Sequence, residues 1–220
     1  MFDSIFNPDN AVFTFINKIV DLIILSLIFI VCCLPVVTIG PACSALYYAV
    51  VKSIRKQRSY CAKEFSREFR ASLKKGSIIH LILIVLTVIS LITDVPLMFS
   101  FFETGEMNNI FLGLLFVFKI IVLLGLVCWI YPLTSRYEQD LLKYFHWALY
   151  LLLKHIPRTL LCIVIAFSSI LLFLLEPLFL VILPSITALL ISFLTEPILR
   201  TICSEEDASN NEKDNWYLEN

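Results

Sequence analysis

The strongest constraint on the fold is a set of apolar stretches, each about as long as a bilayer is thick. The clearest cover residues 19–37, 78–102, 110–133 and 160–175. About 20 apolar residues in a helix are needed to cross roughly 30 Å of hydrocarbon. Hydrophobic residues make up 59% of the 220-residue chain and charged residues 16%, whereas soluble domains average about 45–50% and about 25%. The sequence therefore predicts an all-α, polytopic transmembrane helical bundle.

We expect about six spans, of which the second is short. They cover residues 19–37, 41–56, 78–102, 110–133, 159–176 and 178–197. At the rise of an α-helix, the second span reaches only about 24 Å. Either the basic side chains at its end reach up to the membrane interface, or the bilayer becomes thinner around this span, or the segment is re-entrant. In this interpretation residues 1–202 form a single transmembrane domain, and residues 203–220 form an acidic cytoplasmic tail with the composition of a disordered segment.

Lysine and arginine are concentrated in two of the predicted loops. Residues 52–75 carry nine of them and residues 136–158 carry four, whereas the connections at 38–40 and 103–109 carry none. Because basic loops resist translocation, both belong on the cytoplasmic side. Six crossings place both termini in the cytoplasm. Five crossings, with the second segment re-entrant, place the N-terminus outside, and we favour six.

The first basic loop contains an amphipathic helical pattern. Phe65 and Phe69 are one helical turn apart, and Arg67, Arg70 and Lys74 surround them. Such a helix lies at a membrane interface with its apolar face in the lipid and its cations near anionic head groups, each worth about 1 kcal/mol. We therefore predict a basic interfacial helix in contact with the anionic inner leaflet. Docking to a cytoplasmic partner is the alternative.

Two opposite charges fall inside predicted spans. Asp94 lies nine residues before Glu103, and Lys119 lies nine residues after Ile110, so each is about 13 Å from the outer surface. An isolated charge at that depth costs at least about 2.5–3.5 kcal/mol, and pairing removes much of this cost. We therefore predict a membrane-embedded pair. It either fixes the register of two helices, which is the role we favour, or serves as a substrate or proton site. Pro96, which frees a carbonyl near Asp94, supports the second role.

A turn motif connects the first two predicted spans. In the pattern Leu-Pro-x-x-Thr-x-Gly-Pro, Pro35 and Pro41 bracket a bend at Gly40, and Thr38 lies between them. This motif, with Tyr131-Pro132-Leu133 later in the chain, resembles the YesL-like family of bacterial integral membrane proteins of unknown function. The resemblance implies a multi-pass protein of the bacterial inner membrane, often associated with carbohydrate uptake systems. It implies no reaction and no site residues.

No catalytic or metal-binding pattern stands out in the sequence. The seven cysteines form no Cys-x-x-Cys pair, and no paired acids, histidine cluster or activated serine share one depth. We therefore expect no enzyme, metal or cofactor, and no nucleic-acid partner. Three hypotheses for the function remain. The first is an accessory or assembly partner of a transport system, with sugar transporter subunits as its partners. The second is a small transporter or channel that uses Asp94 and Lys119, and the third is an intramembrane enzyme. We favour the first, with transport as the alternative.

Overall fold

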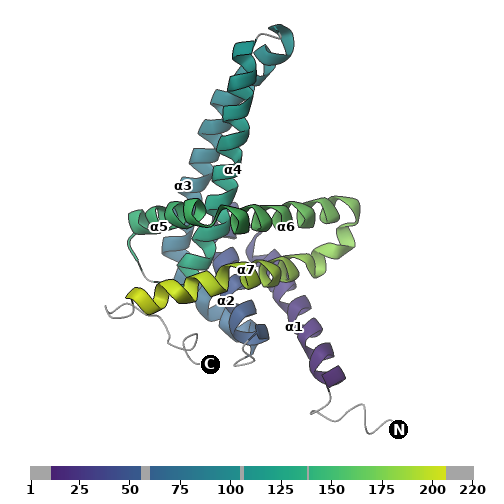
Figure 1. The fold of residues 1–220 in the computed structure, drawn as a ribbon. Helices are drawn as coiled ribbons and strands as arrows, with labels where there is room; N and C mark the ends of the chain where they lie inside the picture. The colour runs from purple at the N-terminus through teal and green to yellow at the C-terminus, as the bar shows by residue number, and fades with distance from the viewer. Residues whose placement is uncertain (1–10, 56–59, 105–106, 138, 207–220) are drawn as a thin grey trace.

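The computed structural model describes residues 11–55, 60–104, 107–137 and 139–206, with side chains except at 11–15, 94, 96–104, 107–112 and 202–206. Most of the chain in these ranges is helical (Figure 1). The α-helices are α1 (Ala11–Cys32), α2 (Ile39–Ala49), α3 (Cys61–Thr104), α4 (Met107–Arg136), α5 (Leu141–Lys154), α6 (Ile156–Leu175) and α7 (Leu183–Glu206). Shorter helical turns are η1 (Val36–Thr38), η2 (Val50–Arg55), which is a π-helix, and η3 (Pro177–Val181).

The predicted all-α fold is confirmed. Within the described residues, five helical segments are long and apolar enough to cross a membrane, and they correspond to the second to sixth predicted spans. They are Val36–Arg55, Cys61–Thr93, Gly113–Arg136, Ile156–Leu175 and Leu183–Thr201. The first predicted span falls on α1, which ends at Cys32. It ends before residue 37 because Pro35 disfavours the helical conformation of the residue before it.

Helix α2 lies at the centre of the fold, in contact with α1, α3, α4 and α7. Nine of its 11 residues are buried. Many of these residues are small, and small side chains let neighbouring helix backbones approach closely. The segment is also longer than we expected. It begins at Val36 and continues through η2 to Arg55, a length of 20 residues that is sufficient to cross a membrane.

Helix α3 runs without interruption for 44 residues, so the predicted separate interfacial helix is instead the first part of a single long helix. At about 1.5 Å per residue it is roughly 66 Å long. Figure 1 shows α3 and α4 as a hairpin that extends beyond the other helices, while α5, α6 and α7 run across it. The helices are therefore not all parallel, as a simple bundle would have them.

Two clusters of buried apolar residues hold the helices together. One joins α2 to α3, α4, α5 and α7 around the indole of Trp129. The other joins α1 to α2, η2 and the start of α3, and it includes Leu25 and Phe65. Both clusters contain residues of α2 or η2, so the second predicted span organises the core.

Candidate functional site

The turn motif ends α1 and begins α2. The hydroxyl of Thr38 donates to the carbonyl oxygen of Cys32 at 2.6 Å and lies 2.7 Å from that of Pro35. Cys32 is the last residue of α1, and the final carbonyls of a helix have no partner within the helix. Thr38 therefore caps the C-terminal end of α1, which explains the threonine of the motif structurally.

Gly40 and Pro41 of the same motif bring α2 against α3. A Cβ atom on Gly40 would lie 2.6 Å from the Cβ of His80 and 2.7 Å from the carbonyl oxygen of Gly76. A Cβ on Gly76 would in turn lie 3.2–3.3 Å from atoms of Pro41. Glycine is therefore required at position 40, where the two helix backbones are nearly in contact.

A buried ion pair connects the C-terminal end of α4 to the middle of α7. Arg136 Nη2 donates to Glu196 Oε1 at 2.5 Å, and the two side chains are only 2% exposed. Tyr47 of α2 donates its hydroxyl proton to Glu196 Oε2 at 3.2 Å, and this hydroxyl lies 2.9 Å from Thr195 Oγ1. One carboxylate therefore binds groups from two other helices.

A second charged cluster lies beside the first, where η2 meets the start of α3. Lys52 Nζ is 3.0 Å from Glu64 Oε2, and Arg67 is 3.2 Å from the same oxygen. Both cations donate to the hydroxyl of Tyr48, at 3.1 Å from Lys52 and 2.6 Å from Arg67. Lys52 and Glu64 are buried. The adjacent residues Tyr47 and Tyr48 thus contact the two clusters.

Arg55 attaches the end of η2 to α7. Its Nη1 donates to the carbonyl oxygen of Ser192 at 2.7 Å, and its guanidinium carbon lies 4.5 Å from the centre of the Phe193 ring. A guanidinium can bind a carbonyl and stack on an aromatic face at once. Arg55 therefore connects α7 to the same end of the fold as the two charged clusters.

The sequence did not predict these clusters. The sixth predicted span ended at residue 197, which placed Glu196 at its end, and Arg67 was expected to contact the inner leaflet. The signal that could have found the second cluster is Glu64, an acid inside a basic segment and three residues before Arg67, on the same helix face. For Glu196 the chain offers only its position inside an apolar span.

The predicted inner-leaflet residues have different environments. Phe65 is 1% exposed and packs in the cluster with α1 and α2, so the prediction of lipid contact is wrong for it. The apolar face of this helix is covered by protein. Phe69 stacks on Phe65 with ring centres 6.0 Å apart and is partly buried. Arg67, Arg70 and Lys74 are exposed, and their contact with lipid stays a prediction.

The predicted pair of embedded charges is not tested. Asp94 lies on α3 and Lys119 on α4, but the side chain of Asp94 is outside the described residues. The side chain of Lys119 is exposed on the hairpin. The pairing of the two stays a prediction.

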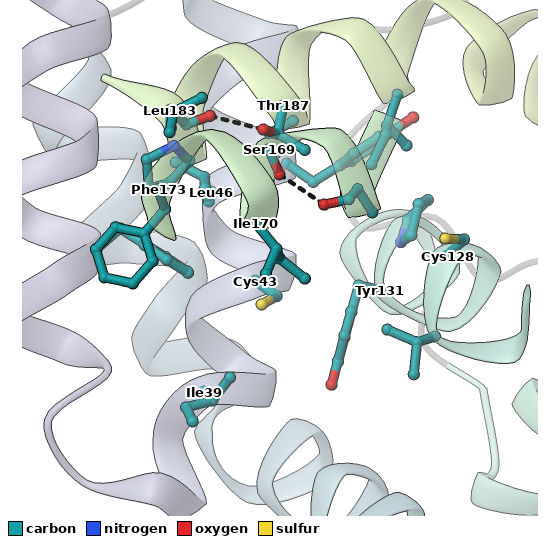
Figure 2. Close-up of a pocket in the computed structure, with 18 of the residues that line it drawn as sticks. Ile39, Cys43, Leu46, Cys128, Tyr131, Ser169, Ile170, Phe173, Leu183 and Thr187 are labelled. Carbon is teal, nitrogen blue, oxygen red and sulfur yellow. Dashed lines mark hydrogen bonds between the residues drawn. The ribbon is translucent and has the colours of Figure 1, made fainter. Parts of the chain in front are cut away.

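An apolar pocket of about 540 Å³ lies between α2, α4, α6 and α7. Figure 2 shows Cys43 on one side of it and Tyr131 on the other, with Ile170 and Phe173 of α6 beside them. None of the residues that line it carries a charge. Sequence analysis did not predict this pocket, because its lining comes from α1, α2, α4, α6, η3 and α7, which span most of the chain. Elsewhere in the described part of the chain, no group of three His, Cys, Asp or Glu residues could hold a metal ion.

Comparison with known protein families gives a match to part of the chain. No curated protein and no solved structure matches the chain significantly. Residues 22–95 match the model of a family described as a protein of unknown function, DUF624. YesL-like proteins carry this domain. The match covers the second half of α1, all of α2 and most of α3, and thus includes the turn motif, the contact of Gly40 with Gly76 and the Lys52–Glu64 pair.

Proposed function

We propose that the chain is a multi-pass protein of a bacterial inner membrane that serves as an accessory or assembly partner of a transport system, carbohydrate uptake in particular. The observation that supports this proposal most directly is that the buried charged side chains of the protein pair with one another across helices. Arg136 pairs with Glu196 and Lys52 pairs with Glu64, and each pair connects separate helical elements. Such pairs fix one arrangement of helices, which suits a protein that presents a defined surface to a partner.

The charged clusters also support the proposed orientation. Lys52 and Arg67 come from the first basic loop of the sequence, and Arg136 begins the second. They gather around Tyr47 and Tyr48, which are adjacent on α2. Both basic loops therefore lie at the same end of α2, and basic loops stay on the cytoplasmic side. The exposed cations of α3, including Arg70 and Lys74, would face the anionic lipids of that leaflet.

A transporter or channel is the alternative, with Asp94 and Lys119 as its charged site. A solute path needs polar groups exposed along a cavity. The pocket among α2, α4, α6 and α7 has an apolar lining without charge, and the charged groups at the end of α2 are paired within each cluster. The proposal therefore assigns the chain no solute of its own, and also no reaction and no cofactor.

The test is crosslinking in native membranes followed by affinity purification of the tagged full-length chain and identification of the captured proteins. We expect subunits of a transporter, and we expect the yield to fall when the Arg136–Glu196 pair is broken by Glu196→Ala. Arg200→Ala is the matched control, since Arg200 is 3.5 Å from the same carboxylate but 41% exposed. Solute uptake by the purified chain alone in liposomes, without captured subunits, would overturn the proposal in favour of the alternative.

A further inference from the structure

The apolar pocket is lined by parts of the chain that are far apart in sequence. Leu46 of α2, Val127 of α4, Phe173 of α6 and Ile191 of α7 each contribute to its lining. Figure 2 shows the labelled side chains of these helices arranged around an open space. The pocket therefore exists only in the assembled fold, and its volume of about 540 Å³ falls within the range of about 300–1,000 Å³ typical of sites for small ligands.

The few polar side chains in the lining are already hydrogen-bonded within the protein. Ser169 donates to the carbonyl oxygen of Ala166 at 2.8 Å, and Thr187 donates to that of Leu183 at 2.7 Å. The hydroxyl of Tyr131 is 2.8 Å from Nδ1 of His80 on α3. An occupant therefore meets hydrocarbon and sulfur surfaces, with no charge to bind. This lining selects an uncharged, apolar group.

An apolar space of this size needs an apolar occupant. Water is excluded from apolar cavities because it finds no hydrogen-bonding partners there, and an empty space loses the dispersion contacts of its walls. A helix from another protein is a poor fit. With side chains it is about 10 Å across, so a volume of 540 Å³ holds little more than one turn of about 5.4 Å. A thin, flexible chain fits better.

We propose that this pocket binds one acyl chain of a bilayer lipid. The inference rests on the proposed placement of the chain in a membrane, where the surroundings of the pocket are lipid tails. Helix α6 supports it because this helix is apolar on its outer side as well. Val164, Phe167 and Ile170 are all more than half exposed, and Ile170 also lines the pocket. A lipid tail can therefore pass from the bilayer into the pocket along an apolar surface, while its head group stays outside.

The test uses the full-length protein in vesicles of phosphatidylethanolamine and phosphatidylglycerol that contain a phospholipid with a photoactivatable diazirine in its acyl chain. After illumination, mass spectrometry locates the attached lipid. We expect more label at Cys43 and Cys128, which line the pocket, than at exposed apolar residues of the α3–α4 hairpin. Equal labelling at both kinds of position would overturn the proposal, because it would indicate ordinary contact with the surrounding bilayer.

Filling the pocket provides the second arm of the test. Ala166 of α6 and Ala188 of α7 line the pocket from two walls, and Ala166→Phe or Ala188→Phe would place a ring in the space of the acyl chain. We expect each variant to lower labelling of the pocket about tenfold. The matched control is Val164→Phe on α6, whose side chain is 62% exposed, and it should leave labelling unchanged. Undiminished labelling in both filled variants would contradict the proposal.

Alkaline extraction of the membranes separates this proposal from the one on which it depends. If the wild-type protein leaves the membrane fraction on extraction, the proposed membrane placement fails and the acyl-chain site fails with it. If the protein stays in the membrane fraction and the pocket is not labelled, only the acyl-chain site is refuted. A thermal unfolding midpoint close to that of wild type in either filled variant shows that its loss of label does not come from misfolding.

Discussion

Replacement of Glu196 by alanine tests the importance of the buried ion pair. In the wild-type fold Glu196 accepts hydrogen bonds from Arg136 and from the hydroxyl of Tyr47, and the carboxylate is almost inaccessible. Glu196→Ala would leave a buried guanidinium without this carboxylate. Breaking a buried pair in this way costs about 3–5 kcal/mol. For a chain of this size, each kcal/mol lowers the unfolding midpoint by about 2–4 °C, so we expect a decrease of roughly 6–20 °C.

The measurement is thermal unfolding of the purified protein in detergent, followed by tryptophan fluorescence. Arg200→Ala is the control, because this partner of Glu196 is 41% exposed and exposed pairs contribute at most about 1 kcal/mol. Joint replacement of both buried partners, Arg136→Met with Glu196→Leu, should recover part of the loss, since an apolar pair leaves no buried charge. Equal midpoints for Glu196→Ala and Arg200→Ala would refute the assignment of a stabilising role to the pair.

Three further predictions follow from the helix contacts and the charge pattern. Gly40→Ala should destabilise the fold by about 1–3 kcal/mol, because its Cβ would overlap His80. Gly113→Ala is the control: its Cβ would meet nothing within 4 Å, so it should be neutral or stabilise α4 by up to about 1 kcal/mol. Thermal unfolding of both variants tests this difference. Cysteines at positions 94 and 119 should form a disulfide under oxidation in a background without other cysteines. The absence of this crosslink would refute the predicted Asp94–Lys119 pair. Single cysteines placed at the starts of α3 and α5 should react with an impermeant thiol reagent only after the cytoplasmic face is opened, and labelling from opposite sides would disprove the topology.

The helical periodicity and the lengths of the apolar runs predicted most of the elements. They predicted the two spans, 78–102 and 110–133, that form the α3–α4 hairpin, although not the 44-residue length of α3. They also predicted the break after α6, where Pro177 starts a separate short turn. The same reasoning was wrong at Pro197, because α7 continues past it to Glu206. Ile198 and Leu199 are buried directly after this proline, so tertiary packing holds the helix together where the local sequence alone favours an interruption.

The environment of each helix face was harder to predict than the helix itself. Phe65 occupies the apolar face of an amphipathic helix as expected, but protein covers that face. Lipid and a protein interior are both apolar, so the sequence pattern of one helix does not distinguish them. The pocket and the Arg136–Glu196 pair were missed for a related reason. Each depends on which distant helices meet, and a single sequence contains no direct record of such contacts.

Helix α7 carries the partners of polar side chains on earlier helices. Tyr47 and Arg136 bind the carboxylate of Glu196, and Arg55 binds the carbonyl oxygen of Ser192, both of which belong to α7. During synthesis these three residues emerge from the ribosome before their partners do. A polypeptide that stops before α7 therefore lacks the carboxylate that Tyr47 and Arg136 bind and the carbonyl oxygen that Arg55 binds. These polar contacts between distant helices can form only after α7 has been synthesised.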